Sequence, residues 1–263
     1  MENEAFKVFD NTKVGLLMDE SNHKKYPISY YNVIDGEGLM PKKDCSYYSY
    51  MYAGHAILSQ EGQCVLLNKG NYFSLNGEFS THTITGCYKM IVIEVHHTKG
   101  VYPETNYRAM FHVGKVEKEG RLKYIDGCTD SLLIPPVKMG DPCFNHLHFP
   151  SNISQTPHTH PSHRIGIVSN GSGECVTPFG NLNLEEDMIF IIKEWDGTTF
   201  KKGLDGEDYE IGNHCFFTYL EAMDVIAFHP DSDFGATDVN HPMINRTIVK
   251  GIPANSIDGI QTK

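Results

Sequence analysis

The sequence predicts an all-β protein made of two tandem antiparallel β-barrels, and three observations carry this prediction. Short runs of β-branched, aromatic and other apolar residues alternate with turn residues at intervals of about 8 to 12 residues. No stretch keeps the apolar period of about 3.6 residues, with caps, that an amphipathic helix needs. The two halves of the chain also repeat the same order of turns and strands, which indicates a duplicated architecture.

The chain divides into three segments. Residues 1–25 are too short to form a domain, and we expect them to pack as an arm against the rest. Residues 26–125 form the first predicted barrel and residues 126–263 the second. The strand-like runs of the first half lie at 46–52, 64–67, 72–75 and 89–95. Prolines and glycines within 120–127 and 132–136 break regular structure, so we place the crossing between the barrels there.

The repeat depends on two glycines and the strands that follow them. Gly54 is followed 16 residues later by the run 70–75, and Gly171 is followed 15 residues later by the run 186–191. In each half a glycine turn, a strand, a second turn and an apolar strand come in the same order. The likeness is one of pattern rather than of identical residues, and it predicts two barrels of one design.

Composition excludes several classes of function. The 263 residues are 40% hydrophobic and 21% charged, as in an ordinary globular protein, and the net charge of -11 argues against nucleic-acid binding. No apolar run approaches the length of about 18 residues that a membrane helix needs, so we expect no membrane partner. The seven cysteines are scattered without a Cys-x-x-Cys pair, which predicts reduced thiols and a cytoplasmic protein.

The strongest chemical signal is a histidine-rich stretch at 155–168. His158 and His160 are flanked by prolines, His163 follows, and an apolar run then begins at Ile165. Side chains two residues apart on extended backbone project to the same side, so the first two imidazoles can converge on one ion. Neutral imidazole is a common ligand of transition metals, which predicts a metal site.

This stretch resembles the first signature motif of the cupin superfamily. That motif is a Gly, five residues, His-x-His, three or four residues, a Glu, six residues and a second Gly. His158 and His160 match its histidines and Gly171 its last glycine, and residues 185–200 resemble the start of the second motif. The resemblance implies a bicupin, with two cupin barrels in tandem and one divalent transition metal in the second barrel.

The chain departs from the cupin pattern at three positions. Asn152 stands at the first glycine, Arg164 at the glutamate, and Thr198 or Thr199 at the histidine of the second motif. A guanidinium stays charged and cannot bind a metal, so Arg164 is instead a candidate clamp for an anionic substrate. Some cupins, such as the thiol and diketone dioxygenases, use three histidines and no carboxylate.

A third ligand must therefore come from elsewhere in the chain. His229 follows an apolar strand at 225–228, and its place at a strand end suits the mouth of a barrel. We predict His158, His160 and His229 as ligands, with His163 as the alternative third residue. Tyr219 precedes the His229 strand and is a candidate acid or base, together with Glu221.

Three other groups of residues favour structural roles. His146 and His148 form a second His-x-His pair, which we expect to line the pocket rather than bind metal. The loop 231–243 is rich in carboxylates but lacks the spacing of an EF-hand, so it is either a cover over the barrel mouth or a solvated turn. In the first half His55 and His82 are isolated. We therefore expect that half to be structural, stabilising the second barrel by packing or by completing a homodimer.

These observations favour a metal-dependent cupin enzyme that acts on a small polar, and if Arg164 faces inward anionic, molecule. With iron, the first expectation, the site suits a dioxygenase-type oxidoreductase. With Zn, Mn or Ni it suits an isomerase or a lyase, because ligand type selects weakly among these metals. The competing hypothesis is a non-catalytic sensor or binding bicupin that has lost its metal, since one fold hosts many functions.

Overall fold

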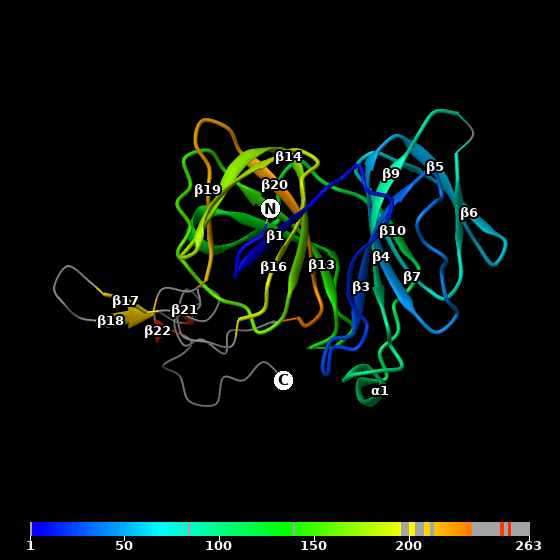
Figure 1. The fold of residues 1–263 in the computed structure, drawn as a ribbon, viewed down its shortest axis with the longest axis horizontal. Coiled ribbons are helices and arrows are strands. Elements are labelled where there is room, and N and C mark those ends of the chain that lie inside the picture. The colour runs from blue at the N-terminus through cyan, green and yellow to red at the C-terminus, as the bar shows by residue number, and fades with distance from the viewer. Residues whose placement is uncertain are drawn as a thin grey trace.

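The computed structural model shows two antiparallel β bodies side by side (Figure 1). It describes residues 2–83, 85–138, 140–195, 200–202, 208–210, 213–232, 248–249 and 252–253. Within these residues, regular structure is almost entirely strand, apart from the short helix α1 (Tyr102–Thr105) and a 3-10 turn at Ile125–Gly127. The predicted all-β class and its two antiparallel barrels are confirmed.

The first barrel joins a six-stranded sheet, in the order β10-β7-β4-β9-β3-β2, to a three-stranded sheet, in the order β6-β5-β8. Its strands are β2 (Gly15–Glu20), β3 (Ile28–Ile34), β4 (Ser46–Ala53), β5 (His55–Gln60), β6 (Gln63–Asn68), β7 (Asn71–Asn76), β8 (Ser80–His82), β9 (Lys89–Val95) and β10 (His112–Lys115). Alternate side chains of these strands fill the interior with a core that includes Tyr47, Leu58, Phe73 and Met90.

The second barrel is one sheet in the order β1-β16-β14-β20-β13-β12-β11, with β15 and β19 also paired to β14. Its strands are β1 (Phe6–Phe9), β11 (Leu122–Lys123), β12 (Thr129–Ile134), β13 (Cys143–Phe149), β14 (Arg164–Thr177), β15 (Gly180–Glu185), β16 (Ile189–Ile192), β19 (Cys215–Phe217) and β20 (Met223–His229). Two small hairpins complete the described strands: β17 (Phe200–Lys202) with β18 (Asp208–Glu210), and β21 (Ile248–Val249) with β22 (Ile252–Pro253).

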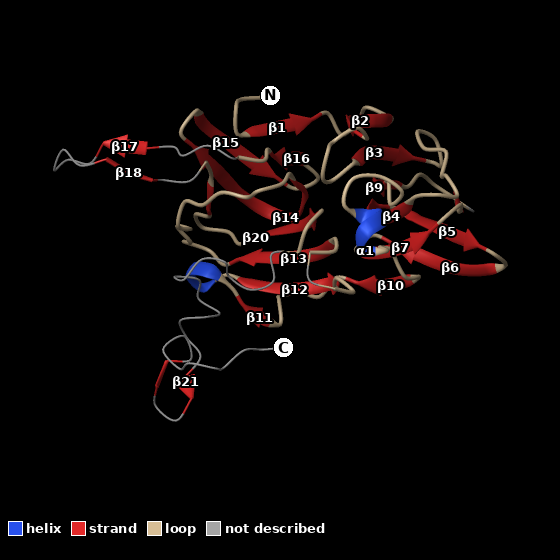
Figure 2. Ribbon diagram, turned by 90° about the horizontal axis from the view of Figure 1, so that it is seen from below, coloured by secondary structure: helices blue, strands red, loops and turns tan. Residues whose placement is uncertain are grey.

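The first 25 residues contribute a strand to each barrel. β1 pairs with β16 of the second barrel, and β2 pairs with β3 of the first (Figure 2). The Phe6 ring stacks on Phe190 with ring centroids 5.2 Å apart, so the arm is part of the second core. At the crossing between the barrels, β11 lies within the first of the two segments expected to connect them and β12 overlaps the second, and both strands belong to the sheet of the second barrel.

The two barrels share one backbone device at Gly54 and Gly171. Both residues have positive φ, 68° and 72°. A Cβ would lie 2.0 Å from the Cys87 carbonyl oxygen in the first case and 1.9 Å from the Ala222 carbonyl oxygen in the second, so only glycine fits either position. Each glycine follows a register shift in its strand pair, between β4 and β9 and between β14 and β20. Gly54 and Gly171 are therefore structurally equivalent residues of the two barrels.

The barrels pack against each other through a shared apolar core. It includes Tyr30 and Tyr48 of the first barrel together with Ile165 and Phe228 of the second. The Tyr48 and Phe228 rings lie 5.0 Å apart between centroids, and the Tyr30 hydroxyl donates to the Gly166 carbonyl oxygen at 3.3 Å. Burial of these large rings ties the two barrels into one unit.

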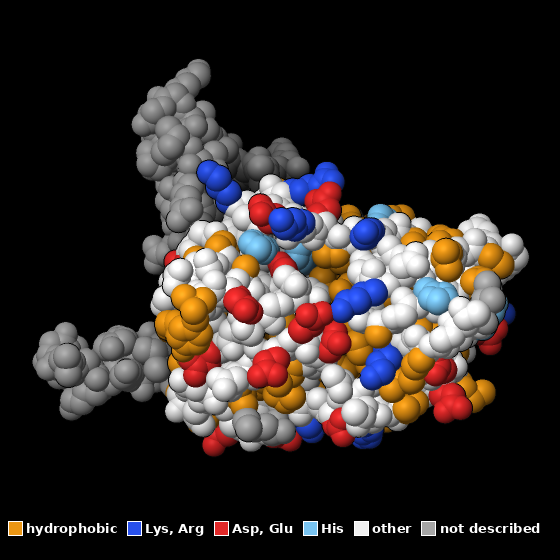
Figure 3. Space-filling view, turned by 90° about the horizontal axis from the view of Figure 1, so that it is seen from above, with side chains coloured by type: hydrophobic (Ala, Val, Ile, Leu, Met, Phe, Trp, Pro, Cys, Tyr) orange, Lys and Arg blue, Asp and Glu red, His pale blue; other side chains and the backbone are white. Residues whose placement is uncertain are grey.

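On the face shown in Figure 3, basic side chains lie singly or in small groups among acidic and apolar ones. The net charge of the chain is -11, so the acidic side chains prevail overall. None of the described helices has the length and apolar character needed to cross a membrane.

Candidate metal centre

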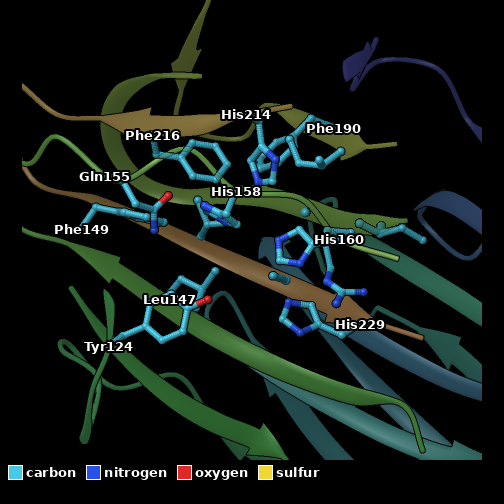
Figure 4. A pocket seen from close by; sticks show the side chains of 16 residues that line it. Tyr124, Leu147, Phe149, Gln155, His158, His160, Phe190, His214, Phe216 and His229 are labelled. Carbon is cyan, nitrogen blue, oxygen red and sulfur yellow. The ribbon is translucent and has the colours of Figure 1, made fainter. Parts of the chain in front are cut away.

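The second barrel encloses a small cavity of about 30 Å³, room for roughly one water molecule. Its walls are mostly apolar, with a few polar groups and four imidazoles at one end (Figure 4). The lining residues are Tyr124, Leu147, Phe149, Gln155, His158, His160, Arg164, Ile165, Gly166, Phe190, Ile192, His214, Phe216, Val225, Ala227 and His229. Polar groups that converge in a mostly apolar cavity mark a candidate binding site, here of a size for an ion or a water rather than for an organic ligand of about 300 Å³ or more.

His158 and His160 reach the cavity because the segment before β14 is extended. The backbone N–H of Gln155 donates to the Phe216 carbonyl oxygen, and that of His158 to the His214 carbonyl oxygen, each at 3.0 Å. The segment thus runs antiparallel to the start of β19, and alternation places both imidazoles on the cavity side. Their ring centroids lie 5.0 Å apart.

His214 completes a group of three imidazoles. Its ring centroid lies 4.4 Å from that of His158 and 5.2 Å from that of His160. One nitrogen of each ring can be chosen so that all three lie within 4.8 Å of one another. Three imidazole nitrogens at this separation form a donor set that fits one transition-metal ion.

Hydrogen bonds hold two of these rings in the orientation that ligation requires. The Nδ1 atom of His158 lies 2.9 Å from the Thr156 carbonyl oxygen, and Nδ1 of His214 lies 2.8 Å from Oδ1 of Asn213. Both acceptors favour the tautomer protonated at Nδ1. The Nε2 atoms then carry the lone pairs that could face an ion, as is usual for metal-binding histidines.

The electrostatics of the cavity favour the neutral form of His160 and His214. Burial lowers the pKa of His160 well below its ordinary value, and the Arg164 charge and the other three imidazoles lower it further. Burial also lowers the pKa of His214 well below its ordinary value, with His158 and Arg164 acting in the same direction. A neutral imidazole is the form that binds metals.

His229 and Arg164 border the same group. His229 ends β20, is buried, and its ring centroid lies 6.2 Å from that of His160. Arg164 begins β14 and also lines the cavity, where its Nη1 donates to Oδ1 of Asp231 at 2.7 Å and to the Ser162 hydroxyl. The carboxylate offsets the guanidinium charge beside the imidazoles, which reduces its repulsion of a cation.

The structure does not bring His163 or Tyr219 to the cavity. His163 Nδ1 accepts the Glu194 backbone N–H at 2.8 Å, and the ring lies 6.3 Å from that of His23. Tyr219 is 61% exposed and its hydroxyl donates to Glu174 at 2.7 Å. Thr198, Thr199 and most of the loop 231–243 lie outside the described residues.

His146 and His148 lie on the opposite face of β13 from the cavity residues Leu147 and Phe149. His146 Nε2 and His148 Nδ1 lie 3.0 and 2.7 Å from the same oxygen of Asp224. They form a buried hydrogen-bonded group rather than the pocket wall that we expected from the sequence, because the alternation of the strand turns them away from the cavity.

Sequence reasoning missed His214 and Gln155 among the polar residues of the cavity. His214 directly precedes the apolar run 215–217, which is the sequence signal that could have found it. The 22 residues 193–214 separate the end of β16 from the start of β19, so the motif spacing, which indicates Thr198 or Thr199, points to a position upstream of His214. Gln155 is buried, lines the cavity, and its Oε1 has no hydrogen-bond partner within the described part of the chain.

Comparison with known proteins supports the fold. No protein-family model and no curated protein matches the chain. Among solved structures, a protein from Pseudomonas aeruginosa described as glyoxylate-induced is 12% identical, with a TM-score of 0.63 and coverage of 90% of this chain and 92% of that one. A cupin 2 conserved barrel domain protein from Leptotrichia buccalis is 11% identical, with a TM-score of 0.55 and coverage of 88% and 91%.

The salicylate 1,2-dioxygenase from Pseudaminobacter salicylatoxidans is also similar in structure. It is 8% identical, with a TM-score of 0.53 and coverage of 77% of this chain and 71% of that one. At these identities the likeness establishes the fold and not the activity. The two barrels are therefore of the cupin type, as the sequence predicted.

Proposed function

We propose that the chain is a metal-dependent cupin enzyme, of the dioxygenase type, that acts on a small polar molecule. The observation that carries the proposal is the convergence of His158, His160 and His214 in a largely apolar cavity. A neutral three-imidazole set holds a divalent transition metal and leaves coordination positions open. Iron bound there would supply the means to activate dioxygen. The similarity in fold to a salicylate 1,2-dioxygenase supports this class of reaction.

The protein residues would bind and orient the substrate. The cavity volume of about 30 Å³ admits a water-sized ligand beside the imidazoles, so an organic substrate must displace lining side chains or bind toward the mouth. Phe149, Phe190 and Phe216 offer an apolar wall to its carbon skeleton. Gln155 offers an amide oxygen that can accept a hydrogen bond from a substrate hydroxyl or N–H.

Arg164 is the candidate partner for an anionic group of the substrate. Its Nη1 is already bonded to Asp231, so the charge that it presents is partly neutralised. An anionic substrate would therefore gain binding affinity from the fixed orientation of the guanidinium, which Ser162 and Asp231 hold in place, rather than from an isolated positive charge. We expect Arg164→Met to raise KM for anionic substrates more than for neutral ones.

The test combines metal content with dioxygen consumption. Protein loaded with Fe(II) under anaerobic conditions is mixed with salicylate and other small hydroxylated carboxylates, and oxygen uptake is recorded. The proposal predicts uptake that is lost, together with the iron bound at the three imidazoles, in a His158→Ala/His160→Ala variant. His163→Ala, whose ring lies away from the cavity, is the matched control and should retain both.

Other outcomes separate the competing functions. Metal retained without oxygen uptake for any substrate would contradict the dioxygenase and favour Lewis-acid isomerase or lyase chemistry with Zn, Mn or Ni. No metal, and a stability unchanged by chelator, would contradict an enzyme of either kind and favour a binding or sensor protein. We likewise propose that the chain is an enzyme, that it is cytoplasmic and that it assembles as a homodimer.

A further inference from the structure

The first barrel contains a second group of metal-ligating side chains, far in sequence from the histidine site. Cys45 directly precedes β4, Glu94 lies in β9, and His96 directly follows β9. Their exposed fractions are 2%, 0% and 7%. One ligand atom of each can be chosen so that all three lie within 4.8 Å of one another.

The three side chains contact one another through the two nitrogens of His96. Cys45 Sγ lies 3.6 Å from Nδ1 of His96, and Oε1 of Glu94 lies 3.4 Å from Nε2 of the same ring. The Lys42 ammonium lies 2.7 Å from Oε1 of Glu94, so a positive charge is held at the carboxylate. The Tyr47 hydroxyl donates to Oε2 of Glu94 at 2.9 Å and orients it.

Thiolate, imidazole and carboxylate are the ligands that zinc prefers in proteins. Tetrahedral bonds of about 2.3 Å to sulfur and about 2.0 Å to nitrogen place the two ligand atoms about 3.6 Å apart. The separation of Cys45 Sγ from His96 Nδ1 has this value. A ring rotation or a small shift of the carboxylate would bring the Glu94 oxygen to the same nitrogen, because the atoms are already within 4.8 Å.

A reactive thiol explains the group less well. Nucleophilic cysteines need exposure to their substrates, whereas Cys45 is buried in the core of the first barrel. The ion pair between Lys42 and Glu94, with the contact of His96 Nε2 and the Ser29 hydroxyl at 3.0 Å, does not account for the buried thiol of Cys45 beside Nδ1 of the same ring. The Lys42 side chain is 51% exposed, so its ammonium can move into solvent when another cation takes its place.

The position of the group in the fold supports a separate site. Tyr47 pairs with Glu94 in the first barrel, where the equivalent positions of the second barrel hold Arg164 and His229. Two residues outward, Cys45 and His96 replace Ser162 and Asp231, which are hydrogen-bonded to each other. The positions that hold Ser162, His229 and Asp231 in the second barrel thus carry ligand-type side chains in the first.

We propose that Cys45, Glu94 and His96 bind a zinc-type divalent cation in the first barrel, and that Lys42 occupies the place of this cation in its absence. The site is independent of the histidine centre and of the activity proposed for it. Three protein ligands leave a fourth position for water or another donor.

Cobalt substitution tests the site, because a thiolate bound to Co(II) gives a charge-transfer absorption band in the near ultraviolet and imidazoles do not. The described cavity of the second barrel is lined by no cysteine, so the band reports the first barrel alone. In the native protein we expect a band intensity that corresponds to one thiolate-bound Co(II) ion per chain. It should vanish in Cys45→Ser and persist in Cys128→Ser, which removes a buried thiol of the second barrel.

Two further variants keep the test decisive if Cys45→Ser does not fold. Lys42→Met removes the competing ammonium and should raise the affinity for Co(II) and Zn(II) severalfold, whereas Glu94→Gln should lower it. The absence of a thiolate band in the native protein, a band that survives Cys45→Ser, or a weaker affinity in Lys42→Met would overturn the proposal. None of these outcomes depends on metal binding at His158, His160 and His214, whose cobalt spectrum lacks the thiolate band.

Discussion

In the first barrel Tyr47 lies opposite Glu94 across β4 and β9, and in the second barrel the equivalent positions on β14 and β20 hold Arg164 and His229. The backbones around them are alike, with the same register shift and a glycine against a carbonyl oxygen. The side chains at the barrel ends differ completely. The duplicated backbone therefore provides equivalent positions at the two barrel ends. The residues at these positions determine whether an end can bind metal through imidazoles, through a thiolate, or not at all.

A second contrast concerns the neighbours of the two sites. In the second barrel Asp231 pairs with Arg164, and the imidazoles beside them are kept neutral by burial. In the first barrel the carboxylate itself, Glu94, belongs to the ligand group and is paired with Lys42.

The largest effect is expected at the core that joins the barrels. Phe228 is fully buried and its ring contacts Tyr48 of the other barrel. Phe228→Ala should lower the free energy of unfolding by about 3–5 kcal/mol, because it leaves a cavity in that core. Urea denaturation measures the change. Tyr219→Ala at an exposed position should stay within about 0.5 kcal/mol, and an equally small effect of Phe228→Ala would show that the barrels do not share a core.

Next come the two glycines that the barrels have in common. Gly54→Ala and Gly171→Ala should each cost about 2 kcal/mol or more, from the positive φ and from the Cβ contact with a carbonyl oxygen. Gly62 also has positive φ, 82°, but no atom lies within 4 Å of its Cβ position, so Gly62→Ala should cost only the left-handed backbone strain of about 1–2 kcal/mol, less than either of the other two. Thermal unfolding compares the three variants. A large loss at only one of the first two would deny the equivalence of the barrels.

The third prediction concerns the orientation of His214. Asn213→Ala removes the acceptor of its Nδ1–H, so the metal affinity of the second barrel should fall by about 10- to 100-fold. Competition with a chelator of known affinity measures this loss in the Cys45→Ser background. Asn170→Ala, whose amide bonds Asp224 outside the cavity, is the control. An equal loss in both variants would mean that Asn213 acts only through general stability.

The smallest effect is the pH dependence of the metal-free protein. The pKa values of His160 and His214 are lowered in the folded state, so the unfolded chain binds more protons below about pH 6.5. Stability should be complete above that pH and should decrease by about 1 kcal/mol or more as the pH falls toward the lowered pKa values. Denaturation in the presence of chelator at several pH values measures it. His214→Ala should show a shallower dependence, and an identical slope would contradict the burial of that imidazole.

Much of this architecture could be predicted from the sequence, because turn spacing, strand alternation and the glycine repeat are local signals. The pairing of His158 with His160 is also a local signal, because side chains two residues apart on one extended segment point to the same side. His214 does not. The insertion between β16 and β19, which includes β17 and β18, moves it away from the position that the motif spacing indicates.

The remaining parts of the two sites depend on contacts between distant segments. Asp231 meets Arg164 across 67 residues, and His96 meets Cys45 across 51 residues. No local pattern marks either pair, because their approach is determined by the pairing of β14 with β20 and of β4 with β9. Only the folded sheet shows that the first barrel, which lacks any His-x-His motif, also gathers ligand-type side chains.

The most direct test of the three-imidazole centre is the metal affinity of His214→Ala, since the geometry alone assigns this residue to the site. Equilibrium titration with Zn(II) or Co(II) in the Cys45→Ser background compares the variant with its parent and with His163→Ala. The account predicts a loss of about 100-fold or more in His214→Ala and none in His163→Ala. An unchanged affinity in His214→Ala, or an equal loss in His163→Ala, would contradict it.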